Sequence, residues 1–157
     1  RPTADPSTCG YGGEIMTAKE YLRQYRDADD AINAKLDQIH RLRELATKTT
    51  TAMSPARVKS SGEPDKLAGI IARIVDMERE VDDSIDRLQD TKRQVEEAIS
   101  GVRDARERKV LTLRYINGLR WEEIAVRLVY HYRWVLELHG RGLRAVEKNM
   151  EAEQWKN

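Results

Sequence analysis

One regular stripe of apolar residues constrains the fold of this chain more than any other feature. Between residues 67 and 102 the apolar residues follow alternating steps of four and three, with two polar interruptions, Glu78 and Lys92. This spacing is typical of a helix that packs a narrow seam against another helix. Pro64 suits a first helical turn, where its missing N–H is not needed, so we predict a long helix from about this residue. The seam consists of Leu67, Ile71, Ile74, Val81, Ile85, Leu88, Val95, Ile99 and Val102.

A second long helix is predicted upstream of the first. Thr17 and Glu20 have the spacing of a capping box, in which each side chain accepts a hydrogen bond from a free backbone N–H of the first turn. The Thr-rich stretch 47–51 is expected to end this helix. Its apolar residues at helical spacing are Leu22, Tyr25, Ile32, Leu36, Ile39, Leu42 and Ala46.

The two stripes match when the helices run antiparallel, because facing residues in such a hairpin have position numbers with a constant sum. A sum of 113 also places Lys35 opposite Glu78, which explains that polar interruption. We therefore favour an intramolecular hairpin. A parallel homodimer through the second helix remains the alternative, because a heptad seam does not identify the chain on which it packs. The pairs are Tyr25–Leu88, Ala28–Ile85, Ile32–Val81, Leu36–Met77, Ile39–Ile74, Leu42–Ile71 and Ala46–Leu67.

The C-terminal part contains three shorter helical patterns separated by turn signals. Gly101 interrupts the long helix, and Asp104 is a suitable N-cap for the next one. That helix ends at Asn117-Gly118, another begins at Trp121, and a third follows from His131. Helices joined by such short turns cross steeply, which makes the last helix available to the major groove of DNA.

The predicted fold is therefore all-α, with a long antiparallel helical hairpin, or coiled coil, at residues 17–100. A three-helix helix-turn-helix module follows at residues 101–150, and Tyr115 and Trp121 are expected to fill its core. Residues 1–15 are rich in Pro, Gly, Ser and Thr, so we expect a disordered tail or extension there. Residues 151–157 are expected to form a flexible C-terminus.

A family resemblance is carried by residues between 103 and 147. These residues are Arg114-Tyr115, Gly118, Trp121, Glu123-Ile124-Ala125, Leu128, Val135, Leu138 and Leu143. Their pattern resembles region four of bacterial sigma factors, and more closely the small sigma-region-four-like transcriptional regulators encoded by phages and prophages of Gram-positive bacteria. The resemblance implies sequence-specific binding to double-stranded DNA and control of late phage genes, such as those for packaging and lysis. It also implies that Arg133, Leu136 and Glu137 approach base edges.

The chemistry of these positions agrees with base reading. Arg133 and Glu137 lie one helical turn apart; arginine can bond guanine O6 and N7, and glutamate can accept from cytosine N4. The distribution of charge also favours DNA binding by the C-terminal part, because residues 101–157 have a net charge of +4 and residues 1–100 a net charge of −3. An ordinary solvated basic face is the alternative interpretation. The candidates for phosphate contacts, which orient a domain without reading sequence, are Arg127, Arg141, Arg144 and Lys148.

Four positions depart from the family pattern. Val129 stands where Gly is usual, His131 where Ser or Thr is usual, Trp134 where a polar residue is expected and Gly142 where Ala is usual. Trp134 and Leu136 place apolar groups on or near the predicted DNA face. Two interpretations remain open: a DNA reader that contacts thymine methyl groups, or a degenerate helix-turn-helix whose exposed patch binds a protein partner such as RNA polymerase.

Other classes of protein have little support in the sequence. No apolar run approaches the roughly 20 residues that cross a bilayer, and residues 1–15 lack the apolar core of a signal peptide. A lone Cys9 cannot build a disulfide framework. The three histidines, His40, His131 and His139, have no catalytic or metal-binding spacing. We therefore expect a cytoplasmic protein of the bacterial host cell that is not an enzyme and that uses no metal or cofactor.

Overall fold

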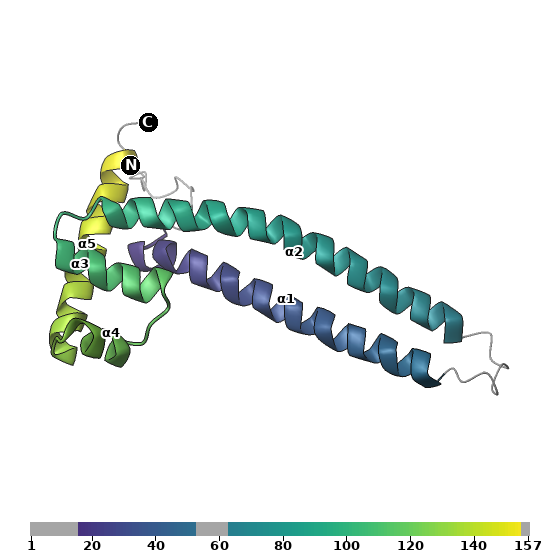
Figure 1. Ribbon diagram of the computed structural model, residues 1–157. Helices are drawn as coiled ribbons and strands as arrows, with labels where there is room; N and C mark the ends of the chain where they lie inside the picture. Colours follow the sequence, from purple (N-terminus) through teal and green to yellow (C-terminus); the bar gives the residue numbers. More distant parts are fainter. Residues whose placement is uncertain (1–15, 53–62, 155–157) are drawn as a thin grey trace, which may run out of the picture.

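The computed structural model describes residues 16–52 and 63–154, and these residues form helices joined by short turns, with no strand among them. The tail predicted at residues 1–15 lies outside the described residues. Two long helices come first, followed by a smaller helical module, as Figure 1 shows. The predicted all-α fold is therefore confirmed. The elements are α1 (Ala18–Ala52), α2 (Glu63–Ser100), α3 (Ala105–Leu111), the π-helical turn η1 (Thr112–Ile116), α4 (Trp121–Leu128) and α5 (Tyr132–Gln154).

The two long helices lie side by side and antiparallel, and together they form an arm that extends from the module (Figure 1). Ile32, Ile39, Ile74 and Val81 form one buried cluster along this arm. Two of the seven pairs that the constant-sum register predicts, Ile32 with Val81 and Ile39 with Ile74, are therefore buried in this cluster. The helical spacing of the stripe determines the packing, because residues that recur every three or four positions lie on one face of a helix.

The register fails for several other residues. Lys35 bonds to Glu80 at 2.9 Å rather than to Glu78, and Glu78 pairs with Arg43. Ile71, which was expected to face Leu42, is 50% exposed, and its neighbour Ile70 packs against the cluster instead. A straight helix drifts by about 20° per heptad from a 3.5-residue repeat, so a seam drawn over five heptads gradually leaves the interface.

The Thr-rich stretch 47–51 does not end α1, as we had predicted, because the helix continues to Ala52. Its threonine hydroxyl groups donate back to carbonyl groups of the preceding turn. Thr47 bonds to Arg43 and Thr51 bonds to Thr47, each at 2.9 Å. The hydroxyl groups are therefore satisfied within the helix, which accommodates the Thr-rich stretch.

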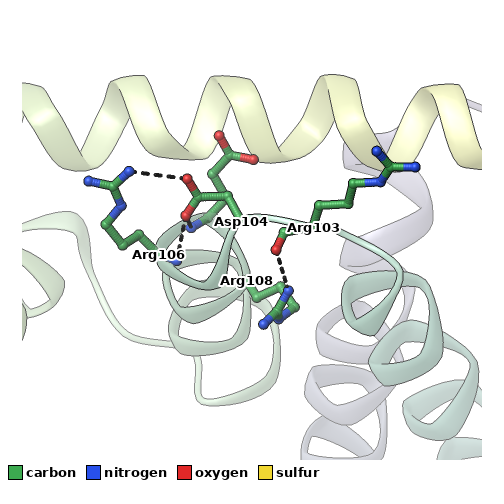
Figure 2. A network of polar contacts seen from close by, with 5 residues as sticks. Arg103, Asp104, Arg106 and Arg108 are labelled. Carbon is green, nitrogen blue, oxygen red and sulfur yellow. Dashed lines mark hydrogen bonds and ion pairs between the residues drawn. The ribbon is translucent and has the colours of Figure 1, made fainter.

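Both predicted N-terminal caps are confirmed. At the start of α1, Thr17 N donates to Glu20 Oε2 at 2.8 Å, and Glu20 N donates to Thr17 Oγ1 at 3.3 Å. At the start of α3, Asp104 Oδ1 accepts from Arg106 N at 2.7 Å, and the Arg106 guanidinium reaches Asp104 Oδ2 at 3.2 Å (Figure 2). These bonds from Arg106 hold the pKa of Asp104 below its ordinary value. They satisfy free donors where the chain leaves α2 and turns into the module.

Two further clusters hold the module in place. The first joins the base of the arm to the module, because Leu22 of α1 and Val95 of α2 pack with Leu111 of α3 and Val146 of α5. The second lies inside the module and contains Val110, Leu113, Ile124, Ala125, Val135 and Leu138. The arm and the module therefore share buried side chains. Helix α5 continues to Gln154, so residues 151–154, which we had expected in a flexible C-terminus, are helical, and residues 155–157 of that prediction lie outside the described residues.

Candidate nucleic-acid interface

The turn before α4 is built around Gly118. The backbone of Gly118 has φ = 69°, a left-handed conformation that glycine adopts without steric cost. The turn is closed by a bond from Leu119 N to Leu113 O at 3.0 Å and by one from Arg114 Nη1 to Leu119 O at 2.9 Å. The sequence predicted the end of the helix at Asn117-Gly118 but not the π-helical widening of η1 before it. The π-helical turn contains one residue more than an α-helical turn, but the helix still ends at Asn117-Gly118.

The turn between α4 and α5 has the same kind of ending, but without glycine. Val129 adopts φ = 55° and ψ = 45°, in the left-handed region. Val129 N bonds to Val126 O at 3.2 Å, and Tyr130 N bonds to Ala125 O at 2.9 Å, which is the pattern of a Schellman motif. Tyr130 then packs against the module core next to Ala125. These contacts fix the direction in which α5 begins.

One face of α5 carries most of the predicted site. Its core side is completely buried at Val135, Leu138 and Val146. Residues that are three or four apart share a helix face, and five residues of the predicted site or beside it are exposed on the opposite face: Arg133, Glu137, Arg141, Arg144 and Lys148. The structure thus brings two predicted base readers together with three predicted phosphate contacts. We call these five residues the outer face of α5.

The remaining predicted residues have different surroundings. Leu136 lies on α5 beside the outer face and is 37% exposed, while Arg127 is exposed on α4. Trp134 is half-buried and packs against the module core, so only part of its ring faces solvent. The Arg141 guanidinium lies 5.1 Å from the centre of the Trp134 ring, within the range of a cation–π contact. Arg141 therefore has a structural neighbour as well as solvent exposure.

An aromatic group that the sequence did not reveal lies on the inner side of α5. His139 stacks with Tyr115 at a ring-centre distance of 5.8 Å and meets the edge of Trp121 at 4.6 Å. Tyr115 Oη and His139 Nε2 are 2.9 Å apart. Burial, together with the smaller effect of the nearby charges of Lys19 and Arg114, lowers the pKa of His139 to about 4, so the ring is neutral at pH 7.

The position of His139, four residues after the core residue Val135, was the one signal in the sequence that it faces inward. Its partners lie on η1 and α4, and no local pattern connects them to it. Among residues 16–52 and 63–154, no three His, Cys, Asp or Glu side chains are grouped so that they could hold a metal ion. None of the described helices is long and apolar enough to cross a membrane.

The fold and this surface define a class of protein: a long two-helix arm joined to a small helical module whose last helix has an exposed, mainly basic face. Comparisons with protein-family models, with curated proteins and with solved structures found no significant match to this chain. Its function must therefore be argued from its own residues.

Proposed function

We propose that this protein is a sequence-specific DNA-binding transcriptional regulator of phage type, similar to sigma factor region four. The observation that carries the proposal is the outer face of α5. There Arg133 and Glu137 lie one turn apart, and Arg144 and Lys148 continue the same exposed surface. A helix with base-reading side chains at its start and cations further along suits the major groove, because phosphates flank the base edges on both sides.

The two turns before α5 support the same proposal. The Schellman motif at Val129 and the left-handed Gly118 fix α3, α4 and α5 relative to one another. A recognition helix must be held in this way, because loose positioning weakens bidentate contacts to bases. In this proposal RNA polymerase is a further partner, and the arm serves as a spacer, a docking surface or a dimer contact.

A binding selection from random duplexes tests the proposal, followed by titrations of the preferred site over a range of salt concentrations. Arg144→Ala should weaken binding about equally for all sequences and lower the salt slope by roughly one unit, because a phosphate contact releases counterions whatever the base. Arg133→Ala should cost about 1–3 kcal/mol on the preferred site and relax the choice of base at one position. Arg79→Ala, on the exposed surface of α2, is the matched control and should change neither quantity.

One observation favours a second candidate function, that of a protein-binding adaptor. Val126 and Val129 are 80% and 88% exposed, and Tyr132 and Leu136 are exposed nearby on the first turns of α5. Such an apolar group next to a turn is typical of a protein contact. If the purified chain shows no salt-sensitive affinity for any duplex at low ionic strength, DNA reading is excluded. Loss of RNA polymerase binding in Val126→Ser or Leu136→Ser would then favour the adaptor.

A further inference from the structure

A cavity of about 340 Å³ lies where the base of the arm meets the module. Its lining comes from α1, η1, the turn at Gly118, α4 and α5, so it is assembled from segments that are distant in the sequence. Four cations line it, and only two carboxylates do, Asp27 and Asp30. The cations are Lys19, Arg23 and Arg26 of α1, and Arg114 of η1.

The two carboxylates neutralise only part of this positive charge. Asp27 lies 3.9 Å from Arg23, and Asp30 lies 4.0 Å from Arg26, at the outer limit of an ion pair. Both are i, i+4 pairs along α1, and the aspartate side chains are 63% and 70% exposed. With four cations against two carboxylates, the lining keeps an excess of positive charge.

Three of these cations also lie close enough to the aromatic group to act on its ionisable members. The charges of Lys19 and Arg114 act on His139 and help to lower its pKa, and those of Arg23 and Arg114 act on Tyr115, where they oppose the rise in pKa that burial causes. All these side chains line one cavity. The inner wall is thus neutral and aromatic, and it carries hydrogen-bonding groups at Tyr115 Oη and His139.

The guanidinium of Arg26 lies close against the backbone of Gly118. A Cβ atom at this position would lie 2.4 Å from Arg26 Nη1, so the guanidinium lies directly over the turn and any larger residue would displace it. Arg26 thereby connects the arm to the turn that precedes α4. Its side chain is 35% exposed, so it is held in position but remains accessible to a small solute.

Four cations around one cavity repel one another, and because the two carboxylates offset only part of this repulsion, a further anion in the cavity would lower its free energy. Guanidinium groups match the geometry of phosphate oxygens in two-point contacts, and lysine adds a compact charge. The cavity volume is at the lower end of the range for small-molecule sites, roughly 300–1,000 Å³. We propose that this cavity binds a small phosphorylated anion, held by Lys19, Arg23 and Arg26 from the arm and by Arg114 from the module.

The site is distinct from the proposed DNA surface. His139 lies on the inner side of α5, whereas Arg133 and Arg144 lie on its outer face. A ligand in the cavity would contact both the arm and the turn before α4, so it would stabilise their present arrangement. This inference does not depend on DNA binding, because the charges and the cavity belong to the chain alone.

Isothermal titration of the full chain with pyrophosphate tests the proposal, with sulfate at equal ionic strength as the comparison. We expect saturable binding of pyrophosphate and much weaker binding of sulfate. Lys19→Gln and Arg23→Gln each remove one exposed cation of the cavity and should weaken pyrophosphate binding roughly tenfold, the scale of one charge-assisted hydrogen bond. Arg41→Gln removes the same charge from α1 about 22 Å beyond Arg26 and should leave the affinity unchanged.

Backbone and imidazole resonances locate the bound ion in the same protein. Pyrophosphate should shift the signals of Gly118 and His139, and those of the arm tip should not move. Equal weakening by Arg41→Gln, equal binding of sulfate, or shifts spread along the whole arm would overturn the proposal, because each indicates general charge screening. If duplex DNA shifts Gly118 and His139 while pyrophosphate does not, the phosphate comes from nucleic acid and the small-ligand proposal is also wrong.

Discussion

Replacing Val129 by glycine should stabilise the protein, although most substitutions destabilise. Val129 has φ = 55° and ψ = 45°, a conformation that costs an L-residue about 1–2 kcal/mol and suits a β-branched side chain least. Its side chain is 88% exposed, so its removal loses little apolar burial. Glycine also gives the unfolded chain more conformational freedom, which lowers the stability by about 0.4–1 kcal/mol and offsets part of this gain. The expected net gain is therefore about 0.5–1 kcal/mol.

Urea unfolding followed by tryptophan fluorescence measures this effect in the module, because residues 16–100 contain no Trp whereas Trp121 and Trp134 lie within the module. The corresponding rise in Tm is about 1–4 °C for a chain of this size. Val126→Gly is the matched control, because Val126 is 80% exposed but helical. It should destabilise by about 0.5 kcal/mol. If both glycine variants are destabilised equally, the left-handed turn at Val129 is wrong.

Three further predictions follow from the contacts of α5 and the module core. Gly142→Ala should destabilise the protein by about 1 kcal/mol, because the new Cβ would lie 2.9 Å from a buried leucine of α3. At Gly140 a Cβ would meet open space, so Gly140→Ala should stabilise by up to about 1 kcal/mol through helix propensity. The same urea titrations measure both. Because the pKa of His139 is lowered in the folded state, the neutral ring stabilises the fold. This contribution is fully present above pH 6.5 and is lost as the pH falls toward about 4. His139→Gln should therefore flatten the fall in unfolding free energy over this pH range, by less than about 1.4 kcal/mol per pH unit because the ring is partly exposed. The exposed His131→Gln should keep the same fall in unfolding free energy with pH as the natural chain. If the natural chain shows no steeper fall than His139→Gln, His139 does not cause the pH dependence. Ile124→Ala, at a completely buried position, should cost about 2–5 kcal/mol by calorimetry or urea unfolding, and a loss below about 1 kcal/mol would contradict the core described above.

The arm could be predicted from the sequence because its signal is a period repeated over many turns. Ile32 and Val81 are far apart in the chain, yet burial of one face of each helix leaves few registers that bring both inside. The surface pairs could not be predicted in the same way. Lys35 can reach several carboxylates whose free energies of pairing differ by less than about 1 kcal/mol, so a register drawn from apolar residues does not determine its partner.

The candidate site was predictable to the extent that it lies on one helix. Helical spacing alone placed Arg133 and Glu137 on one side of α5, and the structure shows both exposed there. The cavity around His139 could not be predicted, because its walls come from segments that meet only in the folded chain. The left-handed backbone of Val129 was indicated only by the resemblance, in which Gly is usual at this position, because valine itself carries none of the turn preference of glycine or asparagine.

The shared cluster at the base of the arm has a mechanical consequence. Because Leu22 and Val95 pack in the same core as Leu111 and Val146, the arm cannot swing freely, and any rotation of the module must repack these side chains or carry the arm with it. Helix α1 has 35 residues, which corresponds to about 52 Å. A tilt of about 10° at its base would move the far end by about 9 Å over that length. A small adjustment beside α5 would therefore become a displacement of several ångströms at the far end of the arm, large enough to change its contact with a distant partner.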